Sequence, residues 1–334
     1  MWYKQKSKPI VSVIIPNWNG KNLLKTCLNS LKKQTLNNFE VMVVDNGSDD
    51  GSSDYIKRYF PSVKVIQLDK NYGFAKAVNR GIAWAKGQFI VLINNDTEVD
   101  KNCLYYLVEA AKKHQEAGFV AAKMLNFYQR DIIDSAGDYI DVVGHANNIG
   151  LGDKDRSSFS KPGFVFLVTG GGGLFKRQVF DKVGLFDEDY FLYFEDVDLC
   201  LRAQLQGFKG WYEPRAIIYH IHQATAKRVK PFIEYLQFRN MTQTVIKDFP
   251  SALFWKNFNW LRILLVNLNT IRFFATKGLL WQALKAEGWI VVYLPRLIWK
   301  RWQIQKTKKV SDEYLISNFK QKKITFFGLL KNGI

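Results

Sequence analysis

The sequence is poor in the residues that mark secreted and zinc-binding proteins. Its 334 residues include only three cysteines, an odd number set far apart as Cys27, Cys103 and Cys200. This spacing offers no zinc site and indicates reduced thiols in a cytoplasmic compartment. The opening residues run almost directly into an apolar strand pattern, so we expect no secretory signal.

Long apolar runs and the common nucleotide-binding signatures are also missing. A membrane-spanning helix needs roughly 20 consecutive apolar residues, but cations interrupt every such window of the C-terminal third: Arg262, Arg272, Lys277, Lys285 and Arg296. No G-x-x-x-x-G-K-[ST] occurs, and the turn after the first strand pattern, 16–20, is not G-x-G-x-x-G. P-loop NTPases and dinucleotide-dependent dehydrogenases are therefore disfavoured.

The composition is that of a globular protein with a one-sided charge. Hydrophobic residues make up 47% and charged residues 23%, and the length suits one large domain with an appendage. The formal net charge is +18, but from Lys227 onward there are 20 Lys and Arg against 5 Asp and Glu. This asymmetry predicts an anionic partner surface for the C-terminal third, either a membrane or a nucleic acid.

Strand and helix patterns alternate over the first 100 residues. Short β-branched runs predict strands at 11–15, where Pro16 is expected to stop the strand, and at 39–44, 63–68 and 89–93. Helical patterns fill the intervals at 20–34, near 53–59 and at 73–86. This cadence predicts parallel strands joined by right-handed crossovers, as in the half-sheet of nucleotide-binding α/β proteins.

Acids and amides stand where these strands end. Asn17 and Asn19 follow the first strand, and Asp45 follows the second strand. Residues 94–96, which end in Asp96, follow the fourth strand. Open α/β sheets bind ligands beyond the carboxyl ends of their strands. Amides and carboxylates can hydrogen-bond a base and a ribose, and a cation at Asp96 can neutralise a diphosphate. The alternative for 94–97 is turn chemistry with a helix cap.

Two later stretches add candidate chemistry. Residues 163–173 read as a strand ending in a glycine-rich loop, either an anion nest or a crowded turn. In 186–202, acids are embedded among aromatics; if Glu195 begins a helix, Asp198 and Arg202 can pair, which leaves Asp196 facing elsewhere. The alternative is a helix start that favours acids through its dipole.

The segment 216–225 reads as a strand that places His220 and His222 on one face. Such a pair can ligate a metal, although a histidine in a strand is often only a hydrogen-bonded part of the core.

Five separated motifs resemble the family 2 glycosyltransferases in the right order. They are VSVIIPNWN at 11–19, VVDNGSDDGS at 43–52, NYGFAKAVNRG at 71–81, LINNDT at 92–97 and GLFDEDYFLYFEDVDLCLR at 184–202. The resemblance covers about residues 10–245 and is nearest to the rhamnosyltransferase-like branch, whose members modify polysaccharide or lipid-linked glycans. It implies a GT-A fold with a Rossmann-like mixed sheet, a nucleotide-diphosphate sugar donor, a divalent cation (Mg²⁺ or Mn²⁺) and inversion at the anomeric carbon.

The resemblance also implies roles for single residues. Asp196, with Glu195, matches the acidic general base, and Asp96 matches the last acid of the family's D-x-D motif, with His220 near the diphosphate. Asn94 replaces the first acid of that motif, so it adds no charge to the cation. Further residues match positions that bind the donor in this family: Pro16, Asn17, Asn19, Asp45, Asn79, Asn94 and Asn95. Gly171, Gly172 and Asp198 match positions on the acceptor side.

The C-terminal region has a different character. Residues 1–248 are expected to form the catalytic domain, with the donor half at about 10–100 and the acceptor half at about 101–248. Residues 249–334 are basic and aromatic, with six of the ten tryptophans. Helices of this composition lie in the bilayer interface. The alternative is a helical subdomain packed on the catalytic domain, or an oligomer interface.

We therefore expect a cytoplasmic inverting glycosyltransferase, peripheral to the cytoplasmic membrane face, that modifies a lipid-linked or polysaccharide acceptor. The family branch favours a deoxythymidine-diphosphate rhamnose donor, with uridine and guanosine sugars open. One rival is a sugar-phosphate nucleotidyltransferase, which would bring a glycine- and lysine-rich phosphate loop after its first strand. A second is a nucleic-acid-binding protein driven by the basic tail, which the tail's apolar runs disfavour.

Overall fold

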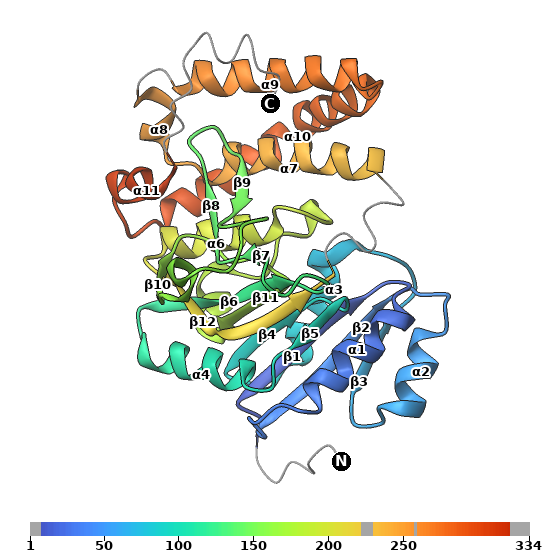
Figure 1. Cartoon of the computed structure of the whole chain (residues 1–334). Coiled ribbons are helices and arrows are strands. Elements are labelled where there is room, and N and C mark those ends of the chain that lie inside the picture. Colours follow the sequence, from blue (N-terminus) through green and yellow to red (C-terminus); the bar gives the residue numbers. More distant parts are fainter. Residues whose placement is uncertain (1–7, 222–229, 257–258, 321–334) are drawn as a thin grey trace.

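A computed structural model describes residues 8–221, 230–256 and 259–320. Its centre is one mixed sheet with helices on both sides, and further helices form a layer at the top of the view in Figure 1. The strands of this sheet are β1 (Val11–Asn17), β2 (Phe39–Asn46), β3 (Lys64–Leu68), β4 (Phe89–Ile93), β5 (Thr97–Val99), β6 (Ala117–Asn126), β7 (Ile133–Ser135), β10 (Gly163–Val165), β11 (Gly172–Lys176) and β12 (Lys209–His220). A separate hairpin pairs β8 (Asp138–Ile140) with β9 (Ala146–Asn148).

The order of strands along the main path is β10-β12-β6-β11-β4-β1-β2-β3. β1 pairs in parallel with β2 and β4, and β2 with β3, so the parallel half-sheet predicted for the first 100 residues is confirmed. β4 is buried at all five positions, as expected of a strand covered on both faces. β11 then enters antiparallel between β4 and β6, which makes the sheet mixed.

The helices follow the predicted spacing closely. They are α1 (Lys21–Leu31), α2 (Ser52–Tyr59), α3 (Gly73–Trp84), α4 (Cys103–Lys113), α5 (Arg177–Val183), α6 (Glu195–Leu205), α7 (Lys230–Asp248), α8 (Ser251–Trp255), α9 (Asn259–Thr276), α10 (Leu280–Lys306) and α11 (Asp312–Asn318), with short 3₁₀ turns η1 (Ser157–Ser160) and η2 (Glu188–Tyr190). In α1 the apolar face formed by Leu24, Cys27 and Leu28 is buried against the sheet.

Two details of the predicted strands were wrong. Pro16 does not stop β1, which continues to Asn17 while Pro16 pairs with Val44 of β2. Pairing with β4 has ended at Ile14, so Pro16 has a neighbour on one side only, where proline is tolerated. The glycine run also does not end a strand; instead it opens β11, because glycine alone allows the close approach to neighbouring strands. A Cβ on Gly172 would lie 2.5 Å from Met124 Sδ.

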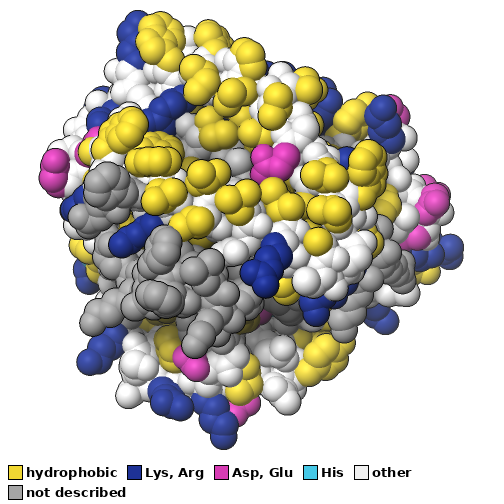
Figure 2. Space-filling view, turned by 90° about the horizontal axis from the view of Figure 1, so that it is seen from above, with side chains coloured by type: hydrophobic (Ala, Val, Ile, Leu, Met, Phe, Trp, Pro, Cys, Tyr) yellow, Lys and Arg dark blue, Asp and Glu magenta, His cyan; other side chains and the backbone are white. Residues whose placement is uncertain are grey.

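The C-terminal helices form a layer with two different faces. The inner face of α10 packs on α7 and contributes Ala283, Ala286, Ile290 and Leu297 to the buried interior. Figure 2 looks down on the layer and shows many hydrophobic side chains on its surface, with Lys and Arg scattered among them. The exposed apolar residues are Trp260, Leu261, Leu264 and Leu268 of α9 and Trp281, Leu284, Val291, Val292, Ile298, Trp299 and Trp302 of α10.

At about 100° per residue these positions fall on one side of each helix, so they form a stripe along it. Within the described ranges, none of the helices combines the length and apolarity needed to cross a bilayer. The domain boundary at residue 248 stays a prediction.

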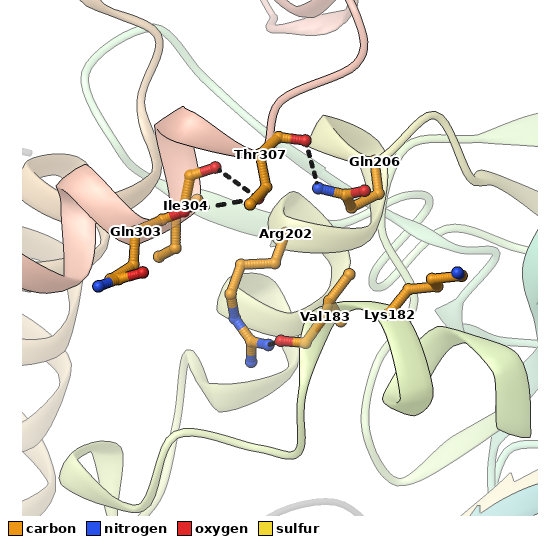
Figure 3. Close-up of a pocket in the computed structure, with 7 residues that line it drawn as sticks. All are labelled: Lys182, Val183, Arg202, Gln206, Gln303, Ile304 and Thr307. Atoms are coloured by element: carbon orange, nitrogen blue, oxygen red, sulfur yellow. Dashed lines mark hydrogen bonds between the residues drawn. The ribbon is translucent and has the colours of Figure 1, made fainter.

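A polar cavity of about 210 Å³ lies where α5, α6 and α10 meet (Figure 3). It is lined by Lys182, Val183, Arg202, Gln206, Gln303, Ile304 and Thr307. The Arg202 guanidinium already donates to the carbonyls of Val183 and Leu185. The cavity lies toward the carboxyl end of α6, away from Asp196, so we assign it to helix packing rather than to chemistry.

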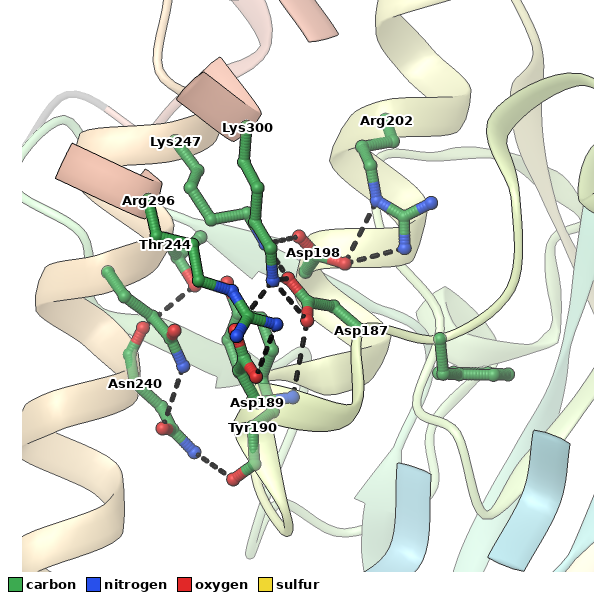
Figure 4. A network of polar contacts seen from close by, with 12 residues as sticks. Asp187, Asp189, Tyr190, Asp198, Arg202, Asn240, Thr244, Lys247, Arg296 and Lys300 are labelled. Atoms are coloured by element: carbon green, nitrogen blue, oxygen red, sulfur yellow. Dashed lines mark hydrogen bonds and ion pairs between the residues drawn. The ribbon is translucent and has the colours of Figure 1, made fainter. Parts of the chain in front are cut away.

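A network of buried ion pairs connects α7 and α10 to α6 and to the 187–189 segment (Figure 4). Lys247 of α7 donates to Asp187 at 2.5 Å and to Asp198 at 2.6 Å, and Arg202 also binds Asp198. Lys300 of α10 lies 2.7 Å from both Asp187 and Asp189. Burial alone would raise the pKa of Asp187, but the charges of Lys247 and Lys300 hold that pKa well below its usual range.

We expect Lys247→Met to lower the free energy of unfolding at pH 7 by about 3–5 kcal/mol, because it leaves two buried carboxylates without their shared cation. The matched control is Lys308→Met, which removes a partly exposed i,i+4 pair with Asp312 and should cost less than about 1 kcal/mol. Urea denaturation measures both values.

The pH dependence of this loss follows from the lowered pKa of Asp187. Stability that comes from a carboxyl with a depressed folded pKa is present above the unfolded pKa, about 4, and is lost below it. The difference between the wild type and Lys247→Met should therefore shrink as the pH falls below about 4. Two outcomes would contradict this role of the network. One is an equal loss of unfolding free energy in Lys247→Met and Lys308→Met, and the other is a difference between wild type and Lys247→Met that does not change with pH.

Candidate active site

The carboxyl ends of β1, β2 and β4 bring three predicted residues into one hydrogen-bonded group. Asn17 donates to Asp45 at 3.3 Å and accepts from Asn95 at 2.7 Å. Ser53, at the start of α2, donates to the other oxygen of Asp45 at 2.5 Å. The parallel register Asn17↔Asp45 explains the meeting, because adjacent parallel strands end at the same edge.

Asn19 joins the turns that follow β1 and β2. Its backbone φ is 50°, a left-handed conformation that asparagine tolerates better than most residues. Its N–H donates to Ser48 at 2.9 Å, and its side-chain oxygen accepts from the N–H of Asp49 at 2.9 Å. Asn19 therefore lies beside the group around Asp45, as the sequence predicted.

Asn79 lies elsewhere, and the structure contradicts its predicted donor-binding role. It is buried in the middle of α3, where its amide donates to the carbonyl of Phe186 at 2.9 Å and accepts from the N–H of Phe186 at 3.1 Å. These bonds hold the 186–188 segment against α3, so the side chain is committed to packing.

Two glycines separate the end of β4 from the predicted base. The N–H of Asn94 donates to the carbonyl of Gly171 at 3.2 Å, and the Asn94 side chain fills the space where a Gly171 Cβ would stand. The N–H of the adjacent Gly170 donates to Asp196 Oδ2 at 2.7 Å. The donor motif and Asp196 are thus on the two sides of one short backbone span.

Gly172 and Asp198 do not face this site, which corrects their predicted acceptor-side roles. Gly172 is buried in β11 against Met124. Asp198 is fully buried and binds Arg202 and Lys247. Residues two apart on a helix point about 200° away from each other, so Asp198 and Asp196 lie on different sides of α6.

The two acids that begin α6 have different surroundings. Asp196 accepts from the N–H groups of Gly170 and Val197, and burial still raises its pKa. Glu195 Oε2 is buried with no hydrogen-bond partner among the described residues. Burial, followed by the charge of Asp196, raises the pKa of Glu195 well above its usual value. The pair can therefore hold one proton on Glu195 while Asp196 stays ionised.

Asp96 faces His220 across the β5–β12 pair. Thr97 lies opposite His220 in the antiparallel register, which brings His220 Nε2 to 3.3 Å from Asp96 Oδ1. The other ring nitrogen, Nδ1, lies 2.7 Å from Asp134 Oδ2. Burial lowers the pKa of His220, but its bonds to Asp134 and Asp96 outweigh that effect and raise the pKa to about 9.

The residues at Asp96 fit a divalent cation. Asp96 Oδ1 is buried, and the described group that faces it is the His220 ring, whose Nε2 lies 3.3 Å away. A carboxylate and a neutral imidazole are suitable ligands for Mn²⁺, so a bound cation would displace the proton from His220 Nε2, while Asp134 on Nδ1 would keep the ring oriented. The described residues hold no cluster of three or more such ligands. Asp96 and His220 would thus supply two ligands, with diphosphate and water completing the shell. His222 lies outside the described residues.

Sequence reasoning missed three further residues of the site. Asp134, in the short strand β7, contacts His220, and Asp138 accepts the hydroxyl of Ser135. Burial and then the charge of Asp196 raise the pKa of Asp138 well above its usual range. Their stretch D-S-A-G-D matches no motif, and its two acids were its only signal.

Tyr193 is the third residue, and it links the two halves of the site. Burial raises the pKa of Tyr193, and the charges of Glu195 and Asp96 raise it further. Tyr193 thus lies within electrostatic reach of both carboxyls.

Comparison with solved structures agrees with this architecture. The GalNAc-T7 crystal structure with UDP, GalNAc and Mn²⁺ aligns with a TM-score of 0.61 at 18% identity, covering 80% of this chain and 52% of that one. S. aureus TarS aligns with a TM-score of 0.52 at 22% identity, covering 76% and 43%. These likenesses confirm the predicted GT-A fold.

Sequence comparison identifies the family. The poly-beta-1,6-N-acetyl-D-glucosamine synthase of Staphylococcus epidermidis is 25% identical over 209 residues, 62% of this chain and 48% of the relative, so the chain spans about half of that protein. The family model described as glycosyl transferase family 2 matches residues 12–184, just over half of the chain. The chain therefore belongs to glycosyl transferase family 2.

Proposed function

We propose that this enzyme transfers a sugar from a nucleotide-diphosphate donor to a hydroxyl of a lipid-linked or polysaccharide acceptor, with inversion at the anomeric carbon. The observation that carries the proposal is the short span Gly170–Gly171, which contacts Asn94 on the donor side and Asp196 on the other. The polysaccharide synthase among the relatives supports the acceptor class.

In this reaction each acid has a separate task. Asp196 accepts the proton of the acceptor hydroxyl. At the same time the hydroxyl oxygen attacks the anomeric carbon, and the bond from that carbon to the diphosphate breaks. Glu195 keeps its own proton, because a second charge beside Asp196 is unfavourable. Asn17, Asn19, Asp45 and Asn95 bind the nucleoside at the strand ends.

A divalent cation, Mg²⁺ or Mn²⁺, held by Asp96 and His220 would supply positive charge to the departing diphosphate. The Mn²⁺ and UDP named for the GalNAc-T7 structure support this assignment. Asn94 contributes an amide in place of a carboxylate, so Asp96 is the anionic ligand of the N-x-D pair. Through its family branch, we propose deoxythymidine-diphosphate rhamnose as the donor.

The outer face of α9 and α10 is proposed to bind the cytoplasmic face of a membrane. Its apolar stripes include exposed tryptophans, and Arg272, Lys277, Lys285 and Arg296 are exposed on the same two helices or the turn between them. Tryptophan with flanking cations is typical of helices that lie in the bilayer interface. This position suits an acceptor carried on a lipid.

We expect Asp196→Asn to lower the turnover of sugar nucleotide by at least about 10²–10⁴-fold, because the amide cannot accept the proton. Binding of nucleoside diphosphate, measured by calorimetry, should change by less than about twofold. The matched control is Asp181→Asn, an exposed acid on α5. Wild-type turnover in Asp196→Asn would remove this residue from the role of base.

A second prediction concerns the cation. Thermal shifts with the diphosphates of uridine, guanosine and deoxythymidine, each with and without Mn²⁺, should show extra stabilisation when nucleotide and metal are both present. Asp96→Ala should lose this extra part because it removes the anionic ligand. An unchanged Mn²⁺ effect in Asp96→Ala would contradict the assignment. Formation of pyrophosphate from nucleoside triphosphate and sugar phosphate would instead favour the nucleotidyltransferase rival.

The third prediction is that the full-length protein sediments with vesicles of anionic phospholipid. The double substitution Trp281→Glu and Trp299→Glu should weaken this binding by about tenfold or more. Trp84→Glu, at an equally exposed tryptophan of α3, should have no effect. Failure of the wild type to bind vesicles would refute the membrane assignment. A stable dimer would instead identify the face as a subunit interface. Salt-sensitive binding to nucleic acid would favour the alternative that the protein binds nucleic acid through its basic C-terminal third.

A further inference from the structure

The backbone just before α6 adopts conformations that residues with side chains seldom use. Phe191 has φ 65° and ψ −61°, and Leu192 N–H donates to Tyr190 carbonyl at 2.8 Å. This is a classic γ-turn, a rare and strained form. Tyr193 and Phe194 follow with φ of 68° and 69°. Three of these four residues thus have positive φ without being glycine, a combination that persists only where its surroundings enforce it.

One side chain of α7 contacts this loop at three points. The side-chain nitrogen of Asn240, which is fully buried, lies 2.9 Å from the carbonyls of Tyr190 and Leu192 and 2.7 Å from that of Tyr193, so its two N–H groups are shared among three acceptors. Its oxygen accepts from Arg239 and Gln243, which fixes the orientation of the amide. Figure 4 shows Asn240 reaching from its helix toward Tyr190.

The remaining carbonyls of the loop bind other helices. The carbonyl of Phe191 accepts from the N–H of Phe74, at the start of α3, at 2.6 Å. The carbonyl of Phe194 accepts from Asp198 N–H at 2.9 Å, within α6. Every carbonyl from 190 to 194 therefore has a donor, and Asn240 of α7 contacts three of them.

The strained loop leads directly into the proposed base. Phe194 is the residue before α6, and Asp196 is the second residue of that helix. A loop with ordinary negative φ would send the chain in another direction and turn the first residues of α6. Asp196 would then leave the 2.7 Å contact with Gly170 N–H that holds it beside Asn94.

We propose that Asn240 is a positioning residue for the transfer reaction, and this inference rests on the proposed function of Asp196. By donating to three carbonyls of the strained loop, it sets the direction of α6 and thereby the position of the Asp196 carboxylate. It does not touch the reacting atoms itself. Arg239 assists it, since its guanidinium donates to the carbonyls of Asp189 and Tyr190 at 2.7 and 2.9 Å.

The first test measures release of nucleoside diphosphate to water from a panel of uridine, guanosine and deoxythymidine diphosphate sugars with Mn²⁺. With the donor that the wild type hydrolyses fastest, Asn240→Ala should lower kcat about 100-fold, because small misplacements of catalytic groups cost this much. KM and the affinity for the nucleoside diphosphate should stay within about twofold. A residue that only stabilised the fold would not separate kcat from KM.

The second test asks whether strain in the loop is the cause. Glycine adopts positive φ without steric cost, so Phe194→Gly should make the loop less dependent on Asn240. The fall in kcat caused by Asn240→Ala should therefore be smaller in the Phe194→Gly background than in the wild type. Equal falls in the two backgrounds would refute the strain mechanism.

The control is Val245→Ala, a buried residue of the same helix that packs against Gly144 rather than the loop. It should lower the melting temperature while kcat stays at the wild-type value. If Asn240→Ala does not fold, Asn240→Ser, which keeps one donor, takes its place and should show an intermediate loss of kcat.

The failures of the two proposals are distinguishable. A wild type that turns over none of the sugar nucleotides refutes the proposed function. A wild type that turns over a donor while Asn240→Ala, or Asn240→Ser in its place, keeps full kcat refutes the positioning role alone.

Discussion

The hydrogen bond from Gly170 N–H to Asp196 is the contact on which the arrangement of the site depends. It joins the first turn of α6 to the backbone that precedes β11, whose neighbour Gly171 also receives the N–H of Asn94. Elements separated by about a hundred residues of sequence thus meet across two glycines. A side chain at Gly171 would collide with Asn94. Close approach of backbones, which only glycine permits, is what brings acid and donor motif together.

Buried ion pairs on the opposite side of α6 hold the helix in the position that allows the hydrogen bond between Gly170 and Asp196. Asp198 lies on the far side of α6 from Asp196 and is neutralised by Arg202 and Lys247. An unpaired buried charge would cost several kcal/mol of stability, roughly 3–5 kcal/mol, so these ion pairs favour a single position for α6. The same helix therefore carries the acid proposed as the base on one side and an ion-paired structural acid on the other.

The sequence was informative where the signal was periodic or local. The alternation of strands and helices predicted the parallel half-sheet, and the acids and amides at strand ends predicted the group around Asp45. It failed where partners come from distant elements. Nothing in the sequence indicates that Asn79 turns toward Phe186, that Asp134 meets His220, or that Asn240 bonds the 190–193 segment. Such contacts depend on tertiary packing, which no local pattern encodes.

The attachment of α10 to the 187–189 segment has a geometric consequence. Lys300 and Arg296 bind Asp187 and Asp189, whose chain continues into the strained turn and the catalytic acids. The outward stripe of α10 is consequently tied through ion pairs to the segment that leads to Asp196. On any plane that the stripe adheres to, the centre would keep a constant height. An enzyme bound in this way would select acceptors by length, because only glycans whose reactive hydroxyl projects to that height would reach the centre.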